Sequence, residues 1–318
     1  MRKQLNLIQL SRALVPLFVI LFHANEMMDF YFDYNFLGIS IGTKSGGVYY
    51  FFALSGFMMY YLYHKDFGNQ GIMKRFLNSR FIKIYPVYWI LTFCILPLYF
   101  IFPSFGDGSE TEFLSIIASL LLLPQEHDPI LGVAWSLVHT VFFYLMFTLV
   151  FLKNRMIATV ILFVWASFSL IFSVNLLTSS SYLLNFIFNF NSLIFLAGIG
   201  CAFLVLKIQI HYYLSLLFIV IGLIGFPLSW FNDRFDLIDI GLLQTTTGSS
   251  ILIILGLASI DLQQHIKIPI LLKYLGDASF SIYLSHQLTL SLVSKVLSSV
   301  QFLSTQLSQT EIGRYALI

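Results

Sequence analysis

Nine apolar runs, each about as long as a helix that crosses a lipid bilayer, dominate this sequence. One crossing needs about 20 mostly apolar residues, because the hydrocarbon core is about 30 Å thick. The chain is 58% hydrophobic and only 10% charged, whereas soluble domains are about 25% charged. The sequence therefore predicts an all-α, polytopic bundle of about nine to ten transmembrane helices. The nine runs are 5–24, 46–64, 84–102, 133–152, 156–174, 186–206, 212–230, 240–260 and 276–297.

Lys and Arg are distributed unevenly between the two sides that these spans define. If the N-terminus is cytoplasmic, twelve of these residues lie on the cytoplasmic side and four on the other. Cytoplasmic loops are enriched in Lys and Arg, so this imbalance predicts a cytoplasmic N-terminus. The segment 103–130 contains five acidic residues and no Lys or Arg, and we expect it outside.

Residues 1–318 are interpreted as one integral membrane domain. Arg12 interrupts the first apolar run, which favours a retained helix over a cleaved signal peptide. The run at 113–123 is too short to cross and predicts a helix that lies at the interface or dips into it. The segment 314–318 resembles the beginning of another span, so we expect that a last helix is missing.

Several function classes are disfavoured by composition. A net charge of +2 without a long basic run argues against nucleic acid as a partner. No phosphate-binding GxxxxGK[ST] pattern occurs, which argues against nucleotide-driven transport. Cys94 and Cys201 both lie within apolar runs, so neither a disulfide framework nor a metal site is predicted.

Arg12 and His23 are two costly polar residues in the first apolar run. Eleven residues correspond to about three helical turns and a rise of about 16 Å, so both side chains share one face. Arg12 then lies toward the cytoplasm and His23 toward the outside. Separately, Arg12 could reach the lipid headgroups and His23 could be an interfacial histidine, but the shared face favours a functional pair.

Arg80 and Lys83 lie three residues apart at the expected start of the third helix, where both can face one anion. The alternative is simple membrane anchoring, with Tyr85, Tyr88 and Trp89 as an aromatic belt. A site for a phosphate-bearing cofactor becomes plausible because the arginine of the first helix lies at a similar depth.

Two further clusters combine aromatic and polar side chains. Trp135 and His139 lie one turn apart at the outer end of the fourth span, where an aromatic girdle is the alternative. In the ninth span, Tyr283 and His286 share a face, and neighbouring serines suit close helix packing.

Together these features resemble the acyltransferase-3 family of integral membrane O-acyltransferases. The family's Arg-x10-His signature is matched by Arg12 and His23, and its FF-x-LSGF segment by residues 51–57, which include Ser55. Its Arg-x-x-Arg stretch is matched by Arg80 and, conservatively, by Lys83. Its late Ser-(Phe/Tyr)-Ser-x-Tyr-Leu-x-His segment is matched by residues 279–286.

The resemblance implies transfer of an acyl group, most often acetyl, from cytoplasmic acyl-CoA to a hydroxyl of an extracytoplasmic glycan such as exopolysaccharide. It implies a multi-pass protein of the bacterial plasma membrane, with no metal. Transfer would go directly to the glycan or through a separate extracytoplasmic partner. The implied site has His23 as the general base, Arg12, Arg80 and Lys83 on the phosphates of coenzyme A, and Ser55, Trp135, His139, Tyr283 and His286 in substrate or supporting roles.

Thr140 departs from the family pattern, which often places a glutamate there. Two alternatives stay open, and only the second of them is motivated by Thr140. One is a non-catalytic exporter or flippase, in which intramembrane polar groups line a conduit. The other is a degenerate family member that acts as a sensor or scaffold.

Overall fold

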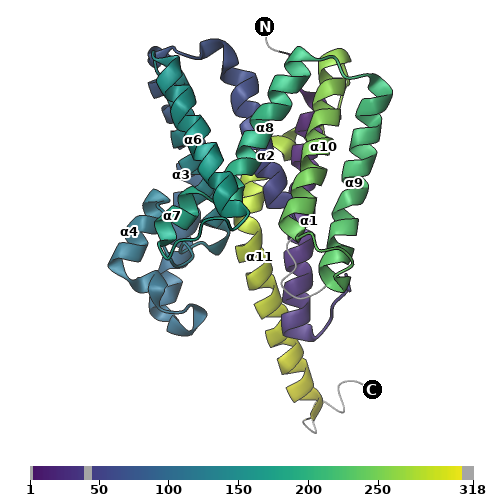
Figure 1. Ribbon diagram of the computed structural model, residues 1–318. Coiled ribbons are helices and arrows are strands. Elements are labelled where there is room, and N and C mark those ends of the chain that lie inside the picture. The colour runs from purple at the N-terminus through teal and green to yellow at the C-terminus, as the bar shows by residue number, and fades with distance from the viewer. Residues whose placement is uncertain (1–2, 39–44, 310–318) are drawn as a thin grey trace.

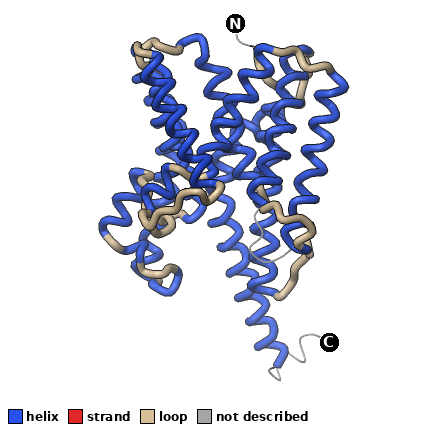
Figure 2. Tube along the Cα trace, in the orientation of Figure 1, coloured by secondary structure: helices blue, strands red, loops and turns tan. Residues whose placement is uncertain are grey.

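The computed structural model describes residues 3–38 and 45–309, and within them it contains helices and no strands (Figures 1 and 2). Five short 3-10 helices, η1 to η5, connect or extend the α-helices; they are His64–Asp66, Pro103–Phe105, Ser109–Thr111, Gly132–Ala134 and Thr148–Phe151. The α-helices are α1 (Asn6–Phe32), α2 (Gly47–Tyr63), α3 (Gln70–Ile101), α4 (Phe113–Leu121), α5 (Trp135–Phe147), α6 (Arg155–Ser173), α7 (Tyr182–Ile187), α8 (Phe190–Lys207), α9 (Tyr212–Phe235), α10 (Leu242–Gln263) and α11 (Ile270–Gln309).

Seven helical segments in the described part of the chain are long and apolar enough to cross a membrane. They confirm a multi-pass helical protein, but the predicted count of nine to ten spans stays a prediction. The runs at 46–64 and 276–297 do fold as helices, within α2 and α11, and are not among the seven. The predicted start of a further span at 314–318 lies outside the described residues. The seven are α1, α3, Gly132–Phe151, α6, Tyr182–Lys207, α9 and α10.

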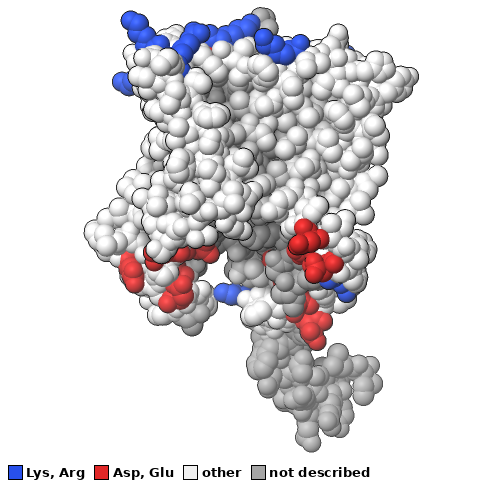
Figure 3. Space-filling model, viewed as in Figure 1, with Lys and Arg blue, Asp and Glu red and all other residues white. Residues whose placement is uncertain are grey.

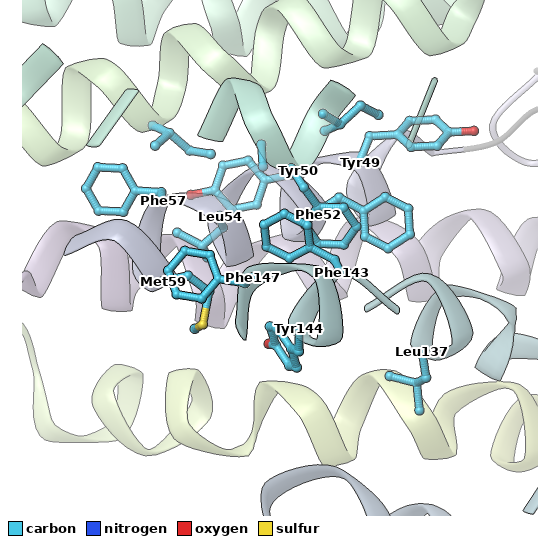
Figure 4. Close-up of a cluster of buried hydrophobic side chains, with 14 of the residues drawn as sticks. Tyr49, Tyr50, Phe52, Leu54, Phe57, Met59, Leu137, Phe143, Tyr144 and Phe147 are labelled. Atoms are coloured by element: carbon cyan, nitrogen blue, oxygen red, sulfur yellow. The ribbon is translucent and has the colours of Figure 1, made fainter. Parts of the chain in front are cut away.

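α2 lies at the centre of the bundle, and most of its residues are buried. Its neighbour α8 approaches so closely that a Cβ at Gly56 would lie 1.9 Å from the Phe195 carbonyl oxygen. A Cβ at Gly198 would likewise lie 1.8 Å from the Ala53 oxygen. Small residues allow such backbone contact between membrane helices. α2 also packs against α5, because the ring centroid of Phe52 lies 6.0 Å from those of Trp135 and His139. Phe143 of α5 belongs to the same buried cluster (Figure 4).

α3 begins at Gln70, whereas the sequence predicts that the helix starts at Arg80 and its membrane span at residue 84, so the predicted start of the third helix is wrong. The Asn69 side chain caps this helix by accepting a hydrogen bond from the Gly71 N–H, 3.1 Å away. Basic residues lower the hydropathy of the first turns without preventing helix formation. Arg80 and Lys83 consequently lie inside a helix, on a rigid element.

Three aromatic side chains of α3 hold the end of the short helix α4. Tyr88 donates to the Ser119 carbonyl (2.7 Å), Trp89 to that of Leu120 (2.8 Å) and Tyr85 to that of Leu121 (3.0 Å). Because the last carbonyls of a helix lack partners within it, these bonds satisfy groups that would otherwise be costly in a membrane. The aromatic-belt interpretation of these three residues is therefore incomplete.

The N-terminus of α1 is fixed by a buried carboxylate from α10. Asp261, 1% exposed, accepts hydrogen bonds from the backbone N–H groups of Leu7 (2.9 Å) and Ile8 (3.0 Å). A negative charge at this position satisfies free N–H groups and complements the helix dipole. Asp261 thus sets the position of the helix that carries Arg12 and His23.

Charged side chains separate toward the two ends of the bundle. In Figure 3 most visible Lys and Arg lie at the end where the chain begins, and the visible Asp and Glu lie at the opposite end. α11 extends beyond the other helices at this acidic end (Figure 1). The charge pattern agrees with the predicted orientation, which itself stays a prediction.

Candidate functional site

A cavity of about 300 Å³ lies among α1, α2, α3, α5 and α11, and we call it the cationic cavity. The described residues of its lining include three cationic side chains, Arg12, Arg80 and Lys83, and no carboxylate. Among the described residues, no Asp or Glu forms an ion pair with any of the three. Uncompensated positive charge of this density favours a ligand with several negative charges.

Arg12 is held by two neutral partners. Its guanidinium donates to the Gln9 side-chain oxygen (3.0 Å) and to the Ser279 hydroxyl on α11 (3.4 Å). Gln9 in turn donates to Asp277 (2.7 Å), so an amide separates the arginine from the nearest carboxylate. α11 can approach α1 this closely because residue 276 is a glycine. A Cβ at this position would lie only 2.5 Å from the Gln9 carbonyl oxygen.

Arg80 is surrounded by aromatic rings instead of anions. Its guanidinium lies 5.5 Å from the centroid of Phe76, 5.6 Å from that of Tyr144 and 6.0 Å from that of Tyr63. Its Nη2 donates to the Tyr63 hydroxyl (3.4 Å), and its Nε is buried without a partner in the described part of the chain. Aromatic faces stabilise a cation without neutralising it, so Arg80 keeps its capacity to bind an anion.

A second cavity of about 230 Å³ lies toward the acidic end of the bundle, and we call it the histidine cavity. It is lined by His23 and by two carboxylates, Glu26 and Asp128, together with Trp135 and Gln287. Among the residues that the structure describes, no Lys or Arg contributes to this lining. The two cavities therefore differ in the sign of their charged groups.

His23 and Glu26 form a hydrogen-bonded pair, with 2.7 Å between Nδ1 and Oε2, and both side chains are 35% exposed. A carboxylate accepts hydrogen bonds, so Nδ1 of a neutral His23 carries the proton. Its Nε2 is then left with a free lone pair. A histidine oriented in this way by a carboxylate can act as a general base.

Two side chains, Val48 and Tyr283, line both cavities and form the wall between them. The Tyr283 hydroxyl lies 3.0 Å from the Ser136 hydroxyl and 3.2 Å from the Val133 carbonyl oxygen. These bonds hold α11 against the beginning of α5. Thr140, one turn further along α5, lines the cationic cavity and donates to the Ser136 carbonyl (2.8 Å).

The structure brings together most of the predicted site residues, but two of them line neither cavity. His286 is 4% exposed, its ring centroid is 5.1 Å from that of His23, and its Nδ1 contacts the Tyr283 carbonyl. His139 stacks on Phe186 with 4.5 Å between centroids. The cationic cavity contains Arg12, Ser55, Arg80, Lys83 and Tyr283; the histidine cavity contains His23, Trp135 and again Tyr283.

Sequence reasoning missed the carboxylates Glu26, Asp128 and Asp261 as site or positioning residues. Glu26 could have been found, because side chains three residues apart on a helix are neighbours. Asp261 is separated from its partners Leu7 and Ile8 by more than 250 positions, so no local pattern reveals that contact.

Comparison with known proteins gives one family and one relative. A family profile described as "Acyltransferase domain" matches residues 6–317. The exopolysaccharide production protein ExoZ of Rhizobium meliloti (strain 1021) is 25% identical over 300 residues, which cover 87% of this chain and 83% of that protein. No solved structure matches the chain. Since the profile covers nearly all of the sequence, the chain belongs to the acyltransferase-3 family of membrane acyltransferases.

Proposed function

We propose that this protein transfers an acetyl group from cytoplasmic acetyl-CoA to a hydroxyl of an extracytoplasmic glycan. The observation that carries the proposal is the pair of oppositely charged cavities that share the Tyr283 wall. The cationic cavity suits a polyanionic donor. The histidine cavity contains a base, His23, and suits a neutral sugar. We also propose that the protein lies in the bacterial plasma membrane.

Coenzyme A carries phosphates that Arg12, Arg80 and Lys83 can bind by charge-assisted hydrogen bonds. The rise of about 16 Å along α1 from Arg12 to His23 is comparable to the length of the pantetheine arm. The arm would therefore run along the apolar part of the cationic cavity. Its thioester would pass the Tyr283 side chain and reach His23 in the histidine cavity.

His23 then acts as the general base. Its Nε2 accepts the proton of the sugar hydroxyl while the hydroxyl oxygen attacks the thioester carbonyl carbon. The tetrahedral intermediate collapses as the C–S bond breaks, and the thiolate of coenzyme A receives the proton from His23. Glu26 holds the imidazole in position and stabilises the imidazolium that forms transiently.

The printed name of the relative, an exopolysaccharide production protein, supports an exopolysaccharide as the acceptor. A polysaccharide exporter would need a continuous conduit across the membrane. Val48 and Tyr283 instead stand between the two cavities, and this separation favours the enzyme over the exporter. We infer direct transfer to the glycan without a separate acyl-carrying partner.

The test uses inverted membrane vesicles that contain the protein, so that the cytoplasmic side is exposed to acetyl-CoA labelled in its acetyl group. The expected result is label on the glycan inside the vesicles, and its absence with the His23→Ala protein. Equal labelling by the His23→Ala protein would overturn the proposed mechanism. Labelled glycan that appears only when acetyl-CoA is supplied to the opposite side would overturn the proposed sidedness.

A further inference from the structure

A third hollow, an apolar groove of about 250 Å³, lies between α1 and α9. Its walls come mainly from Phe18, Leu21 and Phe22 of α1 and from Trp230 and Phe231 of α9. Phe18, Leu21 and Phe231 are 47%, 41% and 58% exposed. Such exposure on transmembrane helices means that this groove is accessible from the lipid.

The groove adjoins the histidine cavity. Phe22 is 3% exposed and lines both hollows. Its ring packs on Trp230, with 4.6 Å between centroids. The indole N–H of Trp230 donates to the carbonyl of Ser45, which itself lines the histidine cavity (3.2 Å). A molecule in the groove therefore lies one side chain away from the cavity that contains His23.

Of the described residues that line the groove, Arg234 is the one that carries a charge. It lies in the last turn of α9, and its guanidinium is 5.2 Å from the ring centroid of Phe235. In the described part of the chain, no carboxylate forms an ion pair with it. An arginine at the edge of an apolar, lipid-accessible groove is complementary to a lipid phosphate.

We propose that this groove binds the isoprenoid phosphate end of a lipid-linked glycan and thereby presents its sugar to His23. The inference rests on the proposed function, because it names the form of the acceptor used at that same site. The prenyl chain lies against Phe18, Leu21 and Phe231, and the phosphate pairs with Arg234. The sugar, which follows the phosphate, then enters the histidine cavity past Phe22. A phospholipid would supply a phosphate and apolar chains but no sugar to acylate.

The test measures binding without acyl-CoA, so it does not depend on catalysis. The purified protein in phosphatidylcholine nanodiscs is photolabelled with a photoreactive polyprenyl diphosphate that carries glucose. We expect crosslinks within residues 18–22 and 227–235, and displacement by unlabelled polyprenyl diphosphate–glucose but not by phosphatidylglycerol. Equal displacement by phosphatidylglycerol would identify an ordinary anionic-lipid site and overturn the inference.

Two pairs of variants locate the binding. Arg234→Gln should weaken labelling on the order of tenfold, as expected for the loss of a bond to a charged group. Lys207→Gln is its control, because Lys207 also lies in a last helical turn beside an aromatic ring but lines none of the three hollows described above. Leu21→Trp should fill the groove and prevent labelling. Leu14→Trp is the matched control, since Leu14 and Leu21 are both 41% exposed on α1. Unchanged labelling of both groove variants would overturn the inference.

An acylation arm separates this inference from the proposed function. With lipid-linked glucose and free glucose as acceptors, Leu21→Trp should reduce acylation of the first only. Equal acylation of both acceptors by the Leu21→Trp protein would overturn the inference and leave the acyl transfer intact. If the unmodified protein acylates neither acceptor in the presence of acetyl-CoA, the proposed function fails, while a specific photolabel would still support a lipid-linked glycan as the ligand.

Discussion

The cationic cavity and the histidine cavity are built partly from the same helices, yet their chemistry is opposite. Counting the described residues, the first contains three cations and no carboxylate, whereas the second contains two carboxylates and a histidine and no Lys or Arg. Val48 and Tyr283 line both cavities. The contrast shows that one helix, α1, can serve both cavities. It supplies Arg12 to the cationic cavity and His23 to the histidine cavity.

This difference also explains how two substrates can be sorted. A polyanion is attracted to the cationic cavity and repelled by Glu26 and Asp128 of the other one. A neutral sugar has no such preference and can use the hydrogen-bonding groups near His23. Changes in one cavity should therefore affect one substrate and spare the other.

The largest effect is expected from His23→Ala. Loss of a general base typically reduces the rate by about 10²–10⁴-fold, so kcat should fall by this amount while KM for acyl-CoA stays the same. Steady-state kinetics with purified protein measure both quantities. His265→Ala, at an exposed histidine, is the control. A wild-type kcat for the His23→Ala protein would contradict the assignment.

Arg80→Gln should weaken the binding of acyl-CoA instead of slowing the chemical step. The loss of a charge-assisted bond to a phosphate should raise KM for acyl-CoA by about 10–100-fold, with little change in KM for the glycan. Arg80→Lys should have a smaller effect, because the charge remains and only the two-point geometry is lost. If Arg80→Gln raised KM for the glycan instead, the assignment of the cavities would be reversed.

Glu26→Gln should lower kcat on the order of tenfold, because one hydrogen bond to a charged group is weakened and the imidazolium loses its counter-charge. KM for acyl-CoA should not change. A comparison with Glu112→Gln, at an exposed acidic residue outside both cavities, controls for the loss of charge. Equal activity of the two variants would show that Glu26 does not orient His23.

Gly198→Ala tests whether the position of α2 couples the cavities. A Cβ there would overlap the Ala53 carbonyl oxygen, and overpacking typically costs about 1–3 kcal/mol of stability. Because α2 lines both cavities, any effect on KM should be equal for acyl-CoA and for the glycan. Gly200→Ala on the same helix meets nothing within 4 Å and should not lower the thermal unfolding temperature. An equal loss of stability in the two variants would contradict the close-packing account.

Most of the long helices and the grouping of Arg12, Arg80 and Lys83 around one cavity could be predicted from the sequence. These features follow from hydropathy, from 3.6-residue periodicity and from spacing within one segment. The true start of α3 could not be predicted from hydropathy, because Lys74 and Arg75 make its first turns too polar to be recognised as part of a membrane helix. Its capping by Asn69 is the local signal that was available.

Contacts between distant segments account for the rest. Tyr85, Tyr88 and Trp89 fit an aromatic belt equally well until α4, about 31 to 36 positions away, places its carbonyls beside them. His139 has the same spacing to Trp135 that a site residue would have, but its ring packs on Phe186. Sequence spacing defines a helix face and does not define what that face meets.

The most direct test of the two-cavity account is the affinity for acyl-CoA of the His23→Ala protein and of the Arg12→Gln, Arg80→Gln double variant. Isothermal titration with a non-hydrolysable acyl-CoA analogue measures this affinity without turnover. The account predicts a wild-type Kd for His23→Ala and a Kd raised by at least about tenfold for the double variant. A wild-type Kd for the double variant, or a Kd raised as strongly by His23→Ala, would contradict it.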